Sequence, residues 1–170
     1  MSPGSLGMVT GQGKGSVMAT IRVSVEGQVH ASAEQVYRYI ADYRTHHPAF
    51  LPPAFSDFTV EEGGVGAGTV VHFSLKAGGR VQSFRQRVSE PDPGRVLTET
   101  TIGTRNSTTF TVTPEGSTSR VRIATEYVGE RGLSGLIERF LAPFLLRRLY
   151  RDELSRLDRH AIAGGNVSGE

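Results

Sequence analysis

The sequence contains no cysteine and no tryptophan, and only two of its 19 basic residues are lysine. The lack of cysteine excludes disulfides, thiolate metal ligands and a cysteine nucleophile, and it fits a cytoplasmic protein. No apolar run reaches the roughly 18 residues that a membrane-spanning helix needs. The N-terminus also lacks the charged-then-apolar pattern of a signal peptide. These absences favour a single soluble domain without stable membrane insertion.

The length and charge set further bounds. A chain of 170 residues is one ordinary domain, and its net charge of +2 is that of a solvated surface, not of a nucleic-acid-binding protein. The abundance of arginine, alanine and glycine suggests a bacterial gene of high GC content. We expect a disordered glycine-rich tail over residues 1–17, a domain over 18–163 and a disordered tail over 164–170. Met1 and Met18 both remain candidates for the working start.

Alternating apolar and polar residues predict strands through most of the chain. The first runs over residues 21–29, and Ser32 with Gln35 then predicts the start of a helix that ends near Asp42. A proline-bounded turn at residues 46–53 has room for one short helical turn. Six further strands are predicted at residues 55–62, 69–76, 81–90, 96–102, 107–113 and 119–128.

The C-terminal part has the one long helical pattern, residues 133–163. Its apolar residues recur at helical spacing, and its opposite face carries arginines that fit pairing at i, i+4, such as Arg148 with Asp152. Pro143 predicts a kink or break, because proline lacks the backbone donor. Together these elements predict an α+β fold. About seven antiparallel strands curve around this helix, with two short helices after the first strand and a space between sheet and helix.

Several stretches also resemble one known superfamily. They are residues 33–43 followed by Pro48, Phe50 and Pro52, then residues 63–69, 88–97, 110–116 and 140–149. In order and spacing they resemble the START, polyketide-cyclase and pollen-allergen (SRPBCC) proteins, in particular the bacterial polyketide cyclase/dehydrase-like members. The resemblance covers about residues 20–162 and implies the helix-grip fold. It does not imply one activity, because members include lipid carriers, cyclases and hormone receptors.

Alternation also predicts which side chains face the interior. Burial of two arginines is costly, so on residues 81–90 we expect Gln82, Phe84 and Gln86 to face inward. On residues 96–102 the set Val96, Thr98, Thr100, Ile102 is the more apolar, but the spacing of the resembled family favours Leu97 and Glu99. An inward Glu99 would have a raised pKa and become a candidate proton donor or base. A solvent-facing Glu99 remains the alternative.

The candidate ligand-binding residues are therefore mostly apolar or aromatic. They are Tyr39, Phe50, Phe73, Gln82, Phe84, Gln86, Glu99, Phe110, Tyr127, Ile137, Phe140, Leu141 and Phe144, while Leu154 and Leu157 are expected to be plain core. Glu99 and Tyr127 are the catalytic candidates. The five histidines lack metal-site spacing, so we expect no metal and no cofactor, with His46 and His47 solvated in a loop.

These features favour a protein that binds or carries a hydrophobic small molecule, such as a lipid, a quinone or a polyketide-like compound. A polyketide cyclase or aromatase that transfers protons through polar interior residues is the alternative. A protein-interaction module using the arginine-rich helix is a third reading. The ligand and the oligomeric state are left open.

Overall fold

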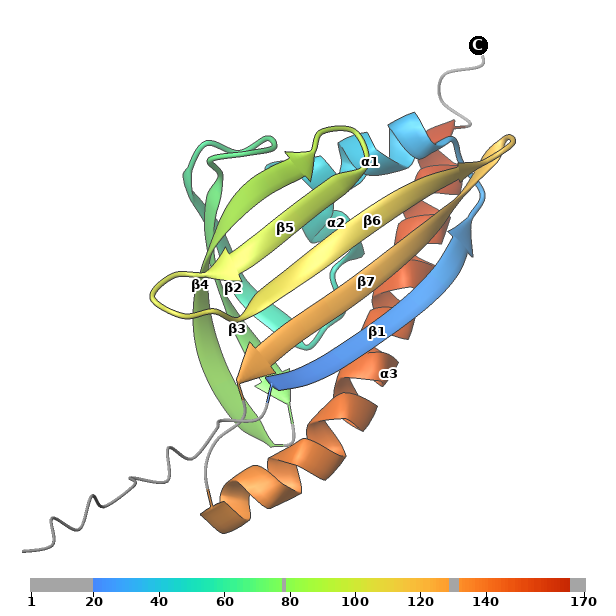
Figure 1. Ribbon diagram of the computed structural model, residues 1–170. Helices are drawn as coiled ribbons and strands as arrows, with labels where there is room; N and C mark the ends of the chain where they lie inside the picture. Colours follow the sequence, from blue (N-terminus) through green and yellow to red (C-terminus); the bar gives the residue numbers. More distant parts are fainter. Residues whose placement is uncertain (1–19, 78, 129–131, 166–170) are drawn as a thin grey trace, which may run out of the picture.

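A seven-stranded antiparallel sheet and one long helix form most of the molecule (Figure 1). The computed structural model describes residues 20–77, 79–128 and 132–165, with the side chains of the last range described from 142 to 164. In chain order the elements are β1 (Thr20–Val29), α1 (Ala33–Ala41), α2 (His47–Phe50), β2 (Phe55–Glu62), β3 (Val70–Ala77), β4 (Arg80–Asp92), β5 (Val96–Thr101), β6 (Ser107–Glu115), β7 (Thr118–Val128) and α3 (Gly132–Gly165).

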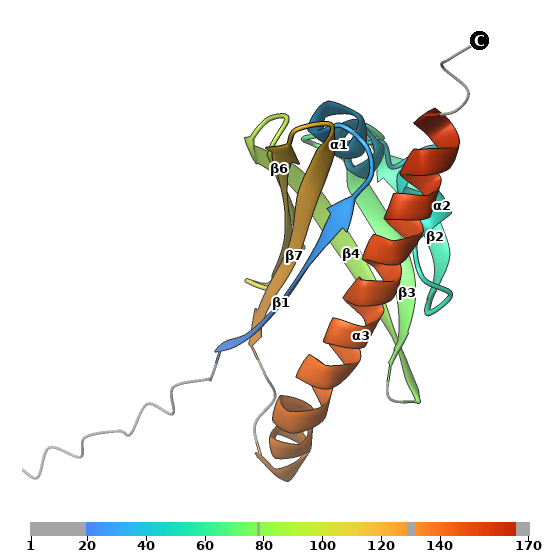
Figure 2. The ribbon, with the colours of Figure 1, turned by 90° about the vertical axis from the view of Figure 1, so that its right-hand side faces the viewer.

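The strand order is β1-β7-β6-β5-β4-β3-β2, which confirms the predicted meander, with β1 closing the far edge beside β7. Figure 2 shows the sheet curving around α3, while α1 and α2 lie at one end of the sheet. The α3 helix packs mainly along β1. This arrangement is the expected helix-grip fold.

The core lies between the inner sheet face and the second half of α3. Tyr150, Leu154, Leu157 and Ala161 recur at helical spacing and are all buried, so the prediction that Leu154 and Leu157 are core is confirmed. Gly27 of β1 permits the close approach of the helix. A Cβ atom there would lie 3.2 Å from Leu154 Cδ1.

The start of α1 follows the predicted capping only in part. Ser32 Oγ accepts a hydrogen bond from the Gln35 backbone N–H at 3.3 Å, as an N-cap should. The Gln35 side chain does not reach back to complete a capping box. Its Nε2 instead donates to the Tyr39 hydroxyl at 3.2 Å and to the Ala161 carbonyl at 3.1 Å, which ties α1 to the end of α3.

Of the predicted kink or break at Pro143, the break is wrong, because α3 runs through this residue as one helix, and the kink stays a prediction. A proline removes a single backbone hydrogen bond, and the buried residues from Tyr150 onward keep the helix on the sheet. The helix also continues to Gly165, two residues beyond the expected end of the domain. The tails over residues 1–17 and 166–170 lie outside the described residues, as do the side chains of Ile137, Phe140 and Leu141.

Candidate functional site

A row of polar side chains crosses the inner face of the sheet under α3. Glu99 of β5 pairs with Thr108 of β6, and Thr108 pairs with Thr125 of β7, so their side chains share that face. The hydroxyl groups of Thr108 and Thr125 lie 2.8 Å apart, and the Tyr150 hydroxyl of α3 hydrogen-bonds to Thr125. We call Glu99, Thr108, Thr125 and Tyr150 the polar row.

The Glu99 carboxyl group is buried, which confirms the inward register of β5 together with Leu97. Burial raises the pKa of Glu99 to about 7, and a hydrogen bond from the Tyr43 hydroxyl to Glu99 Oε1 at 2.7 Å opposes that rise. Burial and the nearby Glu99 charge together raise the pKa of Tyr43 well above its ordinary value. Glu99 therefore changes its charge near neutral pH while Tyr43 stays protonated.

His47 lies beside this pair and is almost fully buried, so the prediction that it is solvated in a loop is wrong. Its ring stacks on Tyr43, and its Nδ1 lies 2.7 Å from the Ile40 carbonyl oxygen. A carbonyl only accepts, so Nδ1 carries the proton and Nε2 presents a lone pair 3.7 Å from Glu99 Oε1. Burial lowers the pKa of His47 to about 4, below that of Glu99, so the two are not charged together.

Glu153 of α3 is a second buried carboxyl group, with 3% of its surface exposed. Burial raises its pKa well above the ordinary value, and the charges of Glu99 and Asp152 raise it further. No lysine or arginine in the described part of the chain is buried to offset these groups. Sequence reasoning missed Glu153. The available signal was its position on the apolar stripe, three residues after Tyr150 and four before Leu157.

One step from the polar row, Gln86 and Thr101 pair across β4 and β5. Gln86 is buried as predicted, and its Nε2 lies 3.5 Å from Thr101 Oγ1. Its carbonyl oxygen Oε1 is buried without a hydrogen-bond partner. An unpaired buried acceptor is costly, so this oxygen favours an external hydrogen-bond donor at this position.

Beyond Gln86 the inner face is apolar and only partly buried. Phe73 stacks on Phe84 at a centroid distance of 5.5 Å, and the neighbouring side chains are only partly buried against the core. We call this surface the apolar lining, formed by Phe73, Leu75, Phe84, Tyr127, Leu146 and Leu149. It extends from the polar row toward the β3–β4 hairpin.

Two predicted ligand residues lie elsewhere. Gln82 is exposed because it lies near the end of the β3–β4 hairpin, opposite the partly buried Leu75. Phe144 is 64% exposed because it falls between Pro143 and Leu145, off the α3 stripe that faces the sheet. Gln82 shares a sheet face with Phe84 and Gln86, as predicted, but the expectation that Gln82 and Phe144 are enclosed in the interior is wrong.

Three predicted aromatics are core residues at the α1–α2 end of the sheet. Phe50 and Phe110 are buried around the His47 ring, at centroid distances of 4.9 and 5.8 Å. Tyr39 stacks on His46, whose Nδ1 lies 3.0 Å from Nε2 of His160, so His46 is not a solvated loop residue either.

A separate surface cavity of about 670 Å³ is lined by residues of α1, the β4–β5 turn and β6. Its lining includes Tyr37, Arg38, Arg95 and Val112, none of which belongs to the polar row. The Tyr37 hydroxyl donates to Glu90 Oε1 at 2.6 Å, so its polar atom is already paired. The titrating groups are gathered under α3, and we take that region as the candidate site.

The described ranges hold no group of three or more His, Asp or Glu side chains placed to ligate a metal ion. Among the same residues, no helix is long and apolar enough to cross a membrane.

Comparison with known proteins gives a consistent result. The family model for polyketide cyclase / dehydrase and lipid transport proteins matches residues 18–161. The solution structure of the KanY protein is 30% identical, with a TM-score of 0.74, over 85% of this chain and 99% of that one. The Zhui aromatase/cyclase from Streptomyces sp. R1128 is 17% identical, with a TM-score of 0.74, over 89% of this chain and 99% of that one.

A START superfamily protein from Mycobacterium smegmatis is 18% identical, with a TM-score of 0.65, over 81% of this chain and 97% of that one. The sequence matches no curated protein. The similarity to the aromatase/cyclase and to the START protein shows a shared fold.

Proposed function

The chain belongs to the polyketide cyclase/dehydrase and lipid transport family, and we propose that it binds a hydrophobic small molecule between the sheet and α3. A lipid, a quinone or a polyketide-like compound fits this description. The observation that carries the proposal is the partly buried apolar lining that leads to buried, titrating polar groups. The apolar surface of this lining that stays exposed gains about 0.8 kcal/mol for each ligand methylene that it buries.

The polar end of the ligand would meet mainly hydrogen-bond acceptors. Gln86 Oε1 has no partner, His47 Nε2 carries a lone pair, and the Glu99 and Glu153 carboxyl groups are buried without a cation. A hydroxyl, enol or amine group on the ligand would satisfy these acceptors. A ligand carboxylate would bring a negative charge to a site where no lysine or arginine of the described residues is buried, so it is disfavoured.

Binding is tested with N-phenyl-1-naphthylamine, a neutral fluorescent probe that carries one N–H donor. We expect the Leu75→Glu variant to weaken the probe at least about tenfold, because it places a charge in the apolar lining. Val65→Glu makes the same chemical change at a site that is 67% exposed at the opposite end of the sheet, and it should leave affinity unchanged. Equal affinities of all three proteins, or no probe binding by wild type, would contradict the proposal.

Catalysis of polyketide cyclisation is the second candidate, favoured by one observation. Glu99 has a pKa of about 7 and faces the Nε2 lone pair of a neutral His47. A group with a pKa near the working pH is suited to take a proton from carbon next to a carbonyl and return it to an enolate. Tyr43 would hold the Glu99 carboxyl group in place. The contribution of Tyr127, the other catalytic candidate, stays a prediction.

For such an enzyme we expect Glu99→Gln to lower kcat by about 10²- to 10⁴-fold while substrate affinity changes little. Glutamine keeps the shape and the hydrogen bond from Tyr43 but cannot exchange a proton. Wild-type kcat/KM should rise with pH through an apparent pKa of about 7. The measurement is product formation from a poly-β-keto substrate followed by chromatography. Unchanged turnover in the variant would remove Glu99 from the mechanism.

A further inference from the structure

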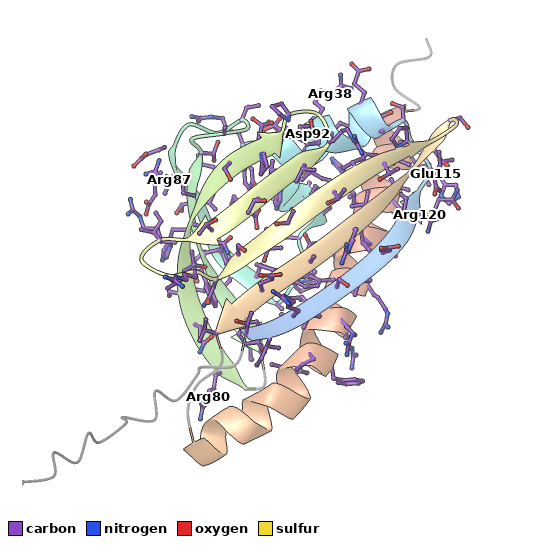
Figure 3. The ribbon with its side chains drawn as sticks, viewed as in Figure 1. Arg38, Arg80, Arg87, Asp92, Glu115 and Arg120 are labelled. Carbon is purple, nitrogen blue, oxygen red and sulfur yellow. The ribbon has the colours of Figure 1, made fainter. Side chains whose placement is uncertain are left out.

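The described arginines and lysines include one set that is paired with carboxylates and another set that has no partner. On the outer sheet face arginines are paired with glutamates, as in Arg85–Glu61 at 2.5 Å, Arg87–Glu62 at 3.3 Å and Arg120–Glu115 at 2.6 Å; Figure 3 labels Arg87, Glu115 and Arg120. A second group has no hydrogen bond or ion pair among the described residues. It consists of Arg38 at the α1 end and, elsewhere, Lys76, Arg80, Arg105, Arg147, Arg148 and Arg151.

Apart from Arg38, the unpaired group lies toward one end of the molecule. The β3–β4 hairpin, the β5–β6 turn and the start of β1 lie at the same end of the sheet according to the strand register. Figures 1 and 2 both show the first half of α3 at this end, and Figure 3 places Arg80 there. We call the β3–β4 hairpin, the β5–β6 turn and residues 142–151 of α3 the open rim.

The open rim also carries exposed apolar side chains. Val81 next to the hairpin turn and Phe144 on α3 are each 64% exposed, and Ile102 in the β5–β6 turn is 40% exposed. They stand on three separate segments, each within a few residues of an unpaired cation. Separate exposed apolar side chains, each near a cation, differ from the continuous apolar patch that is typical of a protein–protein interface.

The nearby carboxylates do not neutralise the open rim. Glu126 at the end of β7 is already bonded to Arg22 at 2.7 Å. Asp152, which directly follows the open rim on α3, is bonded to Arg156 at 3.0 Å, and Asp57 on β2 leaves one negative charge near Lys76. The described part of the open rim itself contains no acidic residue, so its own side chains carry only positive charge.

We propose that the open rim docks on the surface of an anionic lipid bilayer. Guanidinium and ammonium groups would meet lipid phosphates, while Val81, Ile102 and Phe144 would enter the interface between headgroups and acyl chains. The docking is peripheral and involves no spanning segment. It does not depend on the proposed function. If both hold, the apolar lining would face the bilayer, and a hydrophobic ligand could pass between them without crossing water.

The test is flotation of the full chain with vesicles of phosphatidylcholine alone or with about 30 mol % phosphatidylglycerol added. We expect at least about tenfold stronger binding to the anionic vesicles and a loss of binding as salt rises. Each cation near a membrane surface contributes about 1 kcal/mol, or about fivefold in affinity. The R80Q/R147Q/R148Q variant should therefore bind about 100-fold more weakly.

The matched control is R85Q/R87Q/R120Q, which removes the same charge from the paired outer face and should retain binding within about threefold. A V81S/F144S variant should lose the part of binding that survives high salt, and circular dichroism checks that every variant is folded. Equal binding to both vesicle types, or equal losses in the two triple variants, would overturn the proposal. Absence of binding to either vesicle would also overturn it and would favour an acidic protein as the partner of the open rim.

Discussion

Between pH 4 and pH 8 the Glu99→Gln variant is expected to gain about 3 kcal/mol in unfolding free energy relative to wild type. The folded protein holds the Glu99 proton up to a pKa of about 7, whereas the unfolded chain releases it near 4.5. In this window the folded state binds more protons, so wild-type stability contributed by Glu99 falls as pH rises and is lost above pH 7. Glutamine does not titrate, and it still accepts the hydrogen bond from Tyr43.

The contribution of His47 to the pH dependence of stability has the opposite sign. Its pKa is lowered from 6.5 to about 4, so its contribution to stability grows as pH rises from 4 to 6.5. Because His47 is present in both proteins, its contribution cancels in the comparison, as does that of Glu153 to first order.

Urea unfolding at one-unit pH steps gives the unfolding free energy of wild type and of Glu99→Gln as a function of pH. Glu34→Gln, at an exposed position in the first turn of α1, is the control and should run parallel to wild type. Parallel curves for Glu99→Gln would show that Glu99 is not held protonated by burial.

Leu157→Ala should lower the unfolding free energy by about 2 to 5 kcal/mol. Leu157 is 1% exposed in the α3 stripe that packs on the sheet, so its truncation leaves a cavity. Phe144→Ala removes a larger side chain from the same helix, but one that is 64% exposed, and it should change stability by less than about 0.5 kcal/mol. Chemical denaturation of both variants measures the difference. Similar losses for the two would mean that the first half of α3 is anchored as firmly as the second.

Much of the fold was predictable because its signals are local. Alternation and turn residues place both ends of all seven strands within two residues of the observed ends. Ser32 marks the start of α1 correctly, since an N-cap depends only on residues within one turn. The predicted family is confirmed by the match over residues 18–161. The break at Pro143 was wrong because tertiary packing of α3 outweighs the loss of one backbone hydrogen bond.

The site was predictable only where strand alternation reaches it. Gln86 and Glu99 face inward because every second residue of a strand shares a face, and the inward choice on β5 also needed the family resemblance. Gln82 lies on the same face of β4 as Gln86 but is exposed. Alternation predicts which face a side chain is on, but it does not predict how far along the strand other elements cover that face. Phe144 is exposed for a related reason, since an apolar residue need not lie on the buried stripe of its helix.

The inward register of Glu99 could be predicted only with the resemblance to a known family, because alternation alone favoured the opposite face of residues 96–102. The sequence by itself determined the order of strands and helices and the antiparallel meander. These follow from periodicities of two and 3.6 residues, which act between neighbours in the chain. Only the tertiary structure decided that Tyr43, His47 and Glu153 join Glu99, because they come from a loop, a short helix and α3, and no local pattern links them. It also separated paired from unpaired arginines, since an ion pair between strands depends on which residues the sheet register brings opposite each other.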